Sequence, residues 1–230
     1  MGLVAAHLER ISERIDEACS HVGRSSSEVR LMAVSKRQPA ERIEEAVELG
    51  LRLFGESRVQ ETAERRALFP DDAELHLIGH LQRNKARDAA RLYAAVDSID
   101  AERTARALND RLQEAERNLP VLLEVNTSGE ESKQGVRSYD ELARLVEAVL
   151  PLPAVAIRGL MTIGPISTDE GRLRSAFATL REFSVKLSAE FPEATLSELS
   201  MGMSNDYHYA VMEGATTVRV GTALFGARDS

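Results

Sequence analysis

The sequence predicts one α/β domain over residues 1–230, a single (β/α)8 barrel of the TIM type with an extra helix at its N-terminus. Short apolar segments of strand type alternate with amphipathic helical segments, which is the pattern of a parallel sheet covered by helices. Eight such strands follow one another with no linker or low-complexity tract between them, and eight parallel strands can close a barrel. An open doubly wound sheet is the alternative, but no Gly-x-Gly-x-x-Gly follows the first strand, where a dinucleotide-binding sheet carries it.

The first half of the chain is expected to supply the N-terminal helix and four strands. Leu8, Ile11, Ile15 and Ala18 recur at helical spacing and predict a helix over 4–21, which the serines at 25–27 end. Short apolar runs then predict strands at 29–35, 51–54, 75–78 and 93–98. Amphipathic patterns predict the helices that follow these strands, at 41–49, 57–68, 81–92 and 101–116.

The second half repeats the alternation and completes the predicted barrel. Strands are expected at 121–126, 156–161, 195–199 and 217–220, and helices at 139–150, 169–190 and 205–212. The segment 127–135 is predicted as a loop within the domain. Because ligands bind to the loops after the strands in barrels of this type, the strand order decides which residues are candidates for a site.

Composition excludes several classes of function. The formal net charge is −8 and no long basic run occurs, which argues against broad binding to nucleic acid or to an anionic membrane and leaves room for a local cationic pocket. The single cysteine, Cys19, excludes an internal disulfide and a multi-cysteine metal site, and its helical pattern favours a packing role. No signal peptide or membrane-spanning apolar run is apparent, so we expect a cytoplasmic protein.

Lys36 is the first candidate for chemistry. It follows the apolar run of the first predicted strand, so it is expected at the rim where barrel ligands bind. Removal of water from an ammonium favours the neutral amine, which is the form that reacts with an aldehyde to give a Schiff base. The alternative is that Lys36 leaves the strand and extends into solvent.

The loops after the seventh and eighth predicted strands suit a phosphate group. Gly202 is expected to let the backbone come close to a ligand, while Ser200 and Ser204 offer hydroxyls and Ser204 stands where a helix begins. Gly221 and Thr222 repeat this arrangement on the adjacent strand. The structural alternative is that Ser204 only caps a helix and Gly221 only serves a turn.

Together these features fit pyridoxal 5′-phosphate (PLP). Lys36 would form the Schiff base, the two loops would bind the phosphate, and Arg219 would face the pyridine nitrogen. A fixed cation there disfavours the pyridinium form, which weakens the ring as an electron sink. The full set of expected cofactor contacts is Lys36, Asn126, Met161, Ser200, Met201, Gly202, Ser204, Arg219, Gly221 and Thr222.

A series of motifs runs through nearly the whole chain. They are Ala33-Val34-Ser35-Lys36, Phe54-Gly55-Glu56, His76-x-Ile78-Gly79-His80-Leu81-Gln82-x-Asn84-Lys85, Val125-Asn126-x-x-x-Glu130-x-Ser132-Lys133-x-Gly135, Arg158-Gly159-Leu160-Met161, Ser200-Met201-Gly202-Met203-Ser204-x-Asp206 and Val218-Arg219-Val220-Gly221-Thr222-x-x-Phe225-Gly226. In this order they resemble the pyridoxal phosphate homeostasis protein family. The resemblance implies a barrel similar to the N-terminal domain of alanine racemase, PLP on Lys36, a role in buffering and delivering the cofactor, apo forms of PLP-dependent enzymes as partners, and a monomer. Ser57 departs from the asparagine usual in the family, which puts any contact of that asparagine in doubt.

Other polar groups carry weaker hypotheses. His76 and His80 lie four apart on a predicted strand and its loop, so joint metal ligation is not expected, and His76 is interpreted as a pocket wall or a core histidine. His208 is expected to have a surface role. The segment from Glu130 to Lys133 is predicted as a solvated loop, with a mobile flap over the cofactor or a partner-contact loop as the alternatives.

Three functions remain open on the sequence alone. A PLP carrier without turnover is favoured, and we expect no catalytic residues. A PLP-dependent amino-acid racemase would need an acid or base on each face of the substrate, and Tyr207 and Tyr209 lie poorly for the second. A barrel that binds a small phosphorylated molecule without pyridoxal is the third hypothesis, and a colourless pure protein would support it.

Overall fold

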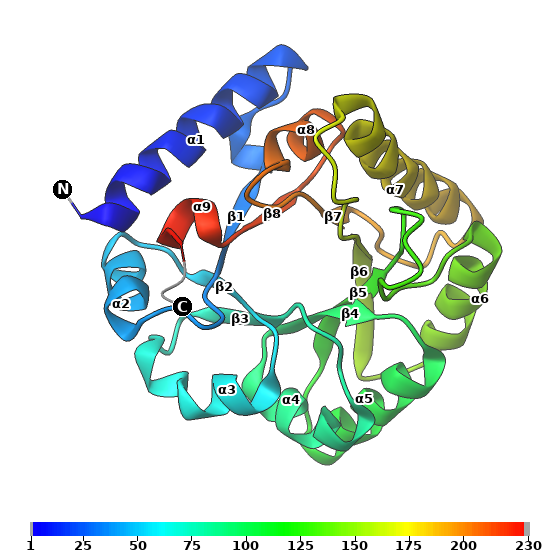
Figure 1. Ribbon diagram of the computed structural model, residues 1–230. Helices are drawn as coiled ribbons and strands as arrows, with labels where there is room; N and C mark the ends of the chain where they lie inside the picture. The colour runs from blue at the N-terminus through cyan, green and yellow to red at the C-terminus, as the bar shows by residue number, and fades with distance from the viewer. Residues whose placement is uncertain (1, 228–230) are drawn as a thin grey trace.

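The computed structural model describes residues 2–227, which form a closed eight-stranded parallel barrel surrounded by helices (Figure 1). The strands follow one another around the barrel in sequence order, and β1 pairs with β8 to close it. The predicted fold class is therefore confirmed. The strands are β1 Arg30–Val34, β2 Leu53–Glu56, β3 Glu74–Leu77, β4 Ala95–Ile99, β5 Leu119–Glu124, β6 Val155–Met161, β7 Glu198–Ser200 and β8 Thr217–Val220.

Helices cover the outside of the barrel, as the amphipathic patterns predict. The α-helices are α1 Leu3–His21, α2 Ala40–Glu48, α3 Val59–Glu64, α4 Ala86–Leu92, α5 Glu102–Glu114, α6 Tyr139–Val149, α7 Glu170–Glu190, α8 Tyr207–Met212 and α9 Thr222–Phe225. Short 3-10 turns occupy Ser26–Glu28, Arg66–Leu68 and Arg83–Lys85. None of the helices in residues 2–227 is long and apolar enough to cross a membrane.

The extra N-terminal helix α1 lies along α8 and α9, against the strands that close the barrel (Figure 1). Its Ile11 and Cys19 are buried in that contact. Glu45 on α2 accepts hydrogen bonds from the amides of Val4 and Ala5 at 3.0 and 3.2 Å, so a neighbouring helix satisfies the free N–H groups at the start of α1. The expected packing role of Cys19 agrees with this burial.

Several predicted boundaries were wrong, and hydrogen bonding explains why. The helix expected at 57–68 is the short α3 and a separate 3-10 turn, because the Arg65 amide is shared between the Glu61 and Thr62 carbonyls and the Leu68 amide bonds to the Arg65 carbonyl. The helices expected at 81–92 and 205–212 begin later, at Ala86 and Tyr207. Of the strand expected at 195–199 only the end pairs, since the Leu196 carbonyl accepts a hydrogen bond from Ser184 Oγ at 2.6 Å instead.

Charged residues occupy the interior of the barrel beside its apolar side chains. Asp97, Glu124 and Arg219 are each at most 5% exposed and lie on β4, β5 and β8. The charges of both carboxylates act on Arg219, which places the three groups near one another across the interior. Buried charges are retained in proteins where they pair with one another or bind a ligand. These three charged residues therefore make the nearby strand ends a candidate ligand site.

Candidate functional site

A cavity of about 420 Å³ opens where the strands end. Loops after β1, β3, β5, β6, β7 and β8 contribute to its wall, which is the face where ligands bind in this architecture. Its size lies within the range of roughly 300–1,000 Å³ that is common for small-molecule pockets. The lining residues are Val34, Lys36, Ile78, Lys133, Ile163, Gly164, Pro165, Ile166, Ser167, Met203, Ser204, Asn205, Asp206, Arg219, Gly221 and Thr222.

Half of the expected cofactor contacts line this cavity. Lys36, Ser204, Arg219, Gly221 and Thr222 are brought together there from β1, the β7–α8 loop and β8. The other five expected residues are not part of the lining, and they are Asn126, Met161, Ser200, Met201 and Gly202.

Lys36 is held in place by the way β1 ends. Strand β1 stops at Val34, and Ser35 Oγ donates a 2.6 Å hydrogen bond to Glu56 Oε1 on β2, both residues being buried. Lys36 is half-buried, and Arg37 adopts the left-handed conformation with φ +57°, so the chain turns sharply after the lysine. Burial raises the pKa of Glu56, while the Ser35 hydrogen bond and the charges of Arg65 and Lys36 oppose that rise.

Arg219 forms the floor of the cavity. Its Nη1 donates to Ser200 Oγ at 2.8 Å, and its Nη2 donates to the Thr162 carbonyl at 2.7 Å. Burial lowers the pKa of Arg219, and the charges of Asp97, Glu124 and Asp206 oppose this effect. A guanidinium stays protonated in proteins, so a cation is fixed here between β6, β7 and β8.

Ser204 joins the two loops that were predicted to bind phosphate. Its Oγ accepts hydrogen bonds from the amides of Gly221 at 3.3 Å and Ala223 at 3.1 Å, and its own hydroxyl proton is left to donate. Among residues 2–227, no acceptor takes the amide hydrogens of Ser204, Asn205 and Thr222. Several N–H and O–H donors therefore converge beside Lys36 and Arg219, and this donor set fits a phosphate group.

Ser204 does not cap α8, the helix that follows it in the chain, although its Oγ accepts from the Ala223 amide in the first turn of α9. Helix α8 begins at Tyr207, and the residue at its N-cap position is Asp206, whose Oδ1 accepts a 2.6 Å hydrogen bond from the Met203 amide. Burial raises the pKa of Asp206, although this hydrogen bond and the charge of Arg219 oppose the rise. The β7–α8 loop is thus folded on its own aspartate, and Ser204 is left to face the β8–α9 loop.

The structure requires a glycine at position 202 for a reason other than the expected approach of the backbone to a ligand. Gly202 has φ +89°, and a Cβ on it would lie 2.6 Å from Ala210 Cβ and 2.8 Å from Tyr207 Cα. The glycine therefore allows the loop to pack on α8, and Gly202 itself does not line the cavity. Its carbonyl accepts a hydrogen bond from the Arg219 amide at 2.9 Å, so it supports the cavity from behind.

The other non-lining residues also support the wall. Ser200, Met161 and Met201 are fully buried beneath it, and Ser200 orients Arg219. The side-chain amide of Asn126 forms hydrogen bonds within its own loop. Its Nδ2 donates to the Glu130 carbonyl at 2.8 Å and to the Lys133 carbonyl at 3.2 Å. Its Oδ1 accepts from the Ser128 amide and hydroxyl. Asn126 therefore shapes the loop after β5.

The loop after β5 is clipped to the loop after β6. Lys133 Nζ donates to Glu130 Oε1 at 3.0 Å and to the Gly164 carbonyl at 2.6 Å, while Glu130 Oε1 accepts from the Ile166 amide at 3.1 Å. The Lys133 side chain is 14% exposed, so this part of the predicted solvated loop is packed. Ile166, 87% exposed, stands at the rim of the cavity.

The wall formed by 163–167 was not predicted, because that segment has no helical or strand periodicity. Lys133 and Asp206 fall within motifs that the resemblance had marked, so their signal was present but no role was assigned to them. Ser57 lines two neighbouring cavities and not this one. Its backbone oxygen would lie 2.3 Å from a Cβ on Gly79.

The three histidines singled out in the sequence, His76, His80 and His208, do not line this cavity. His76 is buried and lines a different cavity with Glu74, and its Nδ1 lies 3.0 Å from Asp97 Oδ1. Burial lowers the pKa of His76, but the charge and hydrogen bond of Asp97 outweigh it and raise the pKa to about 9. His208, expected at the surface, is half-buried, and its Nε2 accepts a 3.0 Å hydrogen bond from Arg14. No cluster of three metal-ligating side chains occurs within the part of the chain that the structure describes.

Known proteins resemble this chain in sequence and in fold. The family described as alanine racemase, N-terminal domain, matches residues 6–229. The pyridoxal phosphate homeostasis protein of Pseudomonas aeruginosa is 42% identical over 230 residues, which covers 100% of this chain and 97% of that protein. PipY of Synechococcus elongatus, solved with PLP bound, is 39% identical with a TM-score of 0.79, and the match covers 94% of this chain and 100% of that chain. An alanine racemase of Clostridium difficile is 15% identical over 99% of this chain and 57% of that chain, with a TM-score of 0.73, which is a likeness of fold.

Proposed function

This chain belongs to the pyridoxal phosphate homeostasis protein family, and on that premise we propose that it binds PLP in the central cavity and passes the cofactor on without turning over a substrate. The observation that carries the proposal is the meeting of Lys36, a phosphate-type donor set and Arg219 in one cavity. PLP supplies an aldehyde for a lysine and a phosphate for such donors.

In this proposal each residue has a separate task. Lys36 Nζ holds the cofactor covalently as a Schiff base. The Ser204 hydroxyl, together with the amides of Ser204, Asn205 and Thr222, binds the phosphate dianion. Arg219, fixed by Ser200 and Thr162, faces the pyridine nitrogen and keeps it unprotonated. Lys133, Met203 and the 163–167 segment limit the access of water.

The same arrangement argues against racemisation. A two-base racemase needs an acid or base on each face of the bound substrate. None of the described residues that line the cavity is a tyrosine. Tyr207 lines a different cavity beside α1, and the Tyr209 ring lies against His208 with centroids 3.9 Å apart. Carrier function is therefore proposed over racemase function, and cytoplasmic apo-enzymes that need PLP are the proposed recipients.

Borohydride trapping tests the attachment. The chain contains only four lysines, Lys36, Lys85, Lys133 and Lys186, so peptide mapping after reduction is unambiguous. We expect the imine absorbance to vanish on reduction and the adduct to lie on Lys36. Lys186 is an internal control, since its ammonium stacks on the Tyr139 ring at 3.5 Å on the outside of the barrel. An adduct mainly on Lys85 or Lys133 would overturn the assignment.

A transfer assay tests the carrier role. The PLP-loaded protein should activate an apo PLP-dependent enzyme and should racemise alanine at a negligible rate. Lys36→Ala should deliver the cofactor with different kinetics, because it holds PLP without the covalent link. Robust racemase turnover that disappears in Tyr207→Phe or Tyr209→Phe would contradict the carrier proposal.

A further inference from the structure

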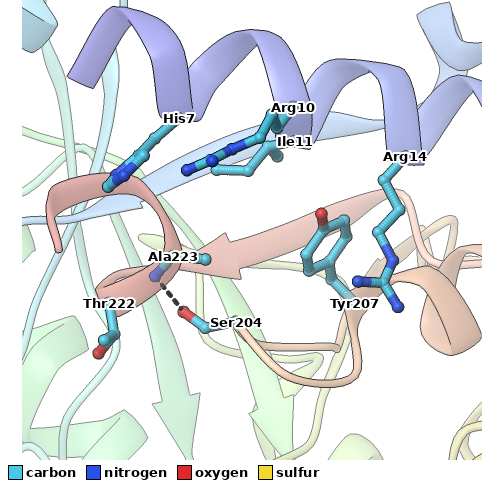
Figure 2. Close-up of a pocket in the computed structure, with 8 residues that line it drawn as sticks. All are labelled: His7, Arg10, Ile11, Arg14, Ser204, Tyr207, Thr222 and Ala223. Atoms are coloured by element: carbon cyan, nitrogen blue, oxygen red, sulfur yellow. Dashed lines mark hydrogen bonds between the residues drawn. The ribbon is translucent and has the colours of Figure 1, made fainter. Parts of the chain in front are cut away.

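A second cavity lies on the outer side of the two loops that carry Ser204 and Thr222. It has a volume of about 430 Å³ and lies between those loops and helix α1 (Figure 2). Ser204 and Thr222 line both cavities, so the loops form a wall shared by the two. Lys36 and Arg219 do not line this outer cavity. Apart from Ser204 and Thr222, its polar side chains are therefore separate from the site assigned to PLP.

The roof of the outer cavity is basic on a protein that is otherwise acidic. His7, Arg10 and Arg14 lie at spacings of three and four along α1, which places them on one face of the helix. The described lining residues include no carboxylate, although the whole chain carries a formal charge of −8. Within residues 2–227 the guanidinium of Arg10 forms no hydrogen bond or ion pair.

Arg14 is also not neutralised by an acid. Its Nη2 donates to His208 Nε2 at 3.0 Å, so the imidazole must present an unprotonated nitrogen there. Burial lowers the pKa of His208 to about 4, and the charge of Arg14 adds to that effect. Neither Arg10 nor Arg14 forms an ion pair with a carboxylate among residues 2–227.

Tyr207 adds a hydroxyl donor at the wall of the outer cavity. Only 4% of this residue is exposed, yet its hydroxyl hydrogen-bonds to none of the residues from 2 to 227. Figure 2 shows the hydroxyl oxygen pointing toward α1, between Arg10 and Arg14. The hydroxyl is therefore available to donate to an acceptor in the cavity.

We propose that the outer cavity binds a phosphate dianion, either free inorganic phosphate or the phosphate of a monoester, between Arg10, Arg14, Tyr207 and Ser204. Donors approach from the helix above, from the tyrosine beside and from the loop below, which suits a tetrahedral anion with three or four acceptor oxygens better than a planar carboxylate with two.

Occupation of the outer cavity opposes retention of PLP, and this second part of the inference rests on the function proposed above. Both lone pairs of Ser204 Oγ are already directed to the Gly221 and Ala223 amides. The hydroxyl has a single proton, which can point into only one cavity at a time. An anion in the outer cavity therefore draws that proton away from the cofactor phosphate and adds a second negative charge behind the shared wall.

The binding test uses the full chain in which PLP has been fixed to Lys36 by borohydride, so that the central phosphate site is filled. Titration with inorganic phosphate, followed by ³¹P NMR, should show saturable binding. Arg10→Ala and Arg14→Ala should each weaken it about three- to tenfold. Arg103→Ala is the matched control, because Arg103 is an exposed arginine on α5 that has no ion pair among the described residues. Methyl phosphate in a parallel titration distinguishes a monoester from the free anion.

The release test measures the rate at which PLP dissociates from unreduced protein, at constant ionic strength. Simple competition leaves a dissociation rate unchanged, so acceleration by phosphate reports the outer site. We expect dissociation about two- to fivefold faster with phosphate than with chloride, and no acceleration in Arg10→Ala. Phosphate binding that Arg10→Ala and Arg14→Ala leave unaltered would overturn the site. If PLP fails to attach to Lys36 at all, the arginine-dependent phosphate titration can still be run on untreated protein, so the two proposals fail separately.

Discussion

At the scale of single residues, the site proposed for the PLP phosphate in the central cavity depends on one hydroxyl, that of Ser204. Ser204 is unusual because it ties two loops together as an acceptor and still has a proton to donate. Sequence reasoning identified this serine from its glycine-rich surroundings but could not choose between a helix cap and a ligand contact. The choice depends on where α8 begins, and that is fixed by the hydrogen bond of Asp206 to the Met203 amide.

Ser204→Ala should weaken PLP binding about tenfold to hundredfold, because it removes a hydrogen bond to a charged acceptor. Fluorescence or absorbance titration with PLP measures the change. Ser167→Ala is the matched control, since Ser167 lines the same cavity but its Oγ accepts a hydrogen bond from the Asp169 amide of its own loop. Wild-type affinity in Ser204→Ala would show that the serine only joins the loops.

Glu124 should make stability depend on pH. Burial and the charge of Asp100 raise the pKa of Glu124 from its ordinary value of 4.5 to about 7. The charge of Arg219 opposes this rise. Between those two pH values the unfolded chain releases a proton that the folded protein keeps, so the free energy of unfolding falls as pH rises through this window.

Replacement of Glu124 by glutamine removes this loss of free energy of unfolding, because glutamine does not titrate. Relative to wild type, Glu124→Gln should gain about 3 kcal/mol in free energy of unfolding between pH 4 and pH 8. Urea titrations at several pH values would show it, with the exposed Glu147→Gln on α6 as control. A difference between variant and wild type that does not change with pH would contradict the assignment.

At the scale of elements, periodicity predicted the strands and their order, and it failed where periodicity is absent. The 163–167 wall and the split of the 57–68 helix are set by contacts between segments far apart in sequence. Likewise, Asn126 looks like a ligand group in a strand-end motif, yet its amide is used within its own loop. Sequence pattern thus placed the candidate residues at the strand ends, while tertiary hydrogen bonds decided which of them line the cavity.

The clip between the β5–α6 and β6–α7 loops should control their motion. Lys133→Met removes the ion pair with Glu130 and the hydrogen bond to the Gly164 carbonyl. Loss of about 1–2 kcal/mol should speed amide exchange in 128–135 and 163–168 by about five- to thirtyfold. Hydrogen–deuterium exchange with mass spectrometry reports this, and Glu131→Gln, on an exposed neighbour, is the control. Unchanged exchange would mean that the clip does not hold the loops.

At the scale of the whole molecule, the surface gives no sign of a large obligate interface among the described residues. Its most exposed large apolar side chains lie on different elements, at Leu3, Val22, Leu49, Ile166 and Val185. Scattered apolar residues are normal on a monomer, whereas stable partners need a contiguous patch. Light scattering after gel filtration should therefore give the mass of one chain, 25.3 kDa. A mass twice as large, independent of dilution, would contradict this expectation.

Because Cys19 is buried on α1, the rate at which its thiol reacts reports how often α1 opens. Its thiol is 1% exposed and burial raises its pKa, so a disulfide reagent such as Ellman's can react only after that helix lifts from the barrel. Since there is no other cysteine, the rate at which the yellow product is released reports this opening, and no label needs to be introduced. If α1 roofs an anion, added phosphate should slow the reaction in wild type and leave Arg10→Ala unaffected.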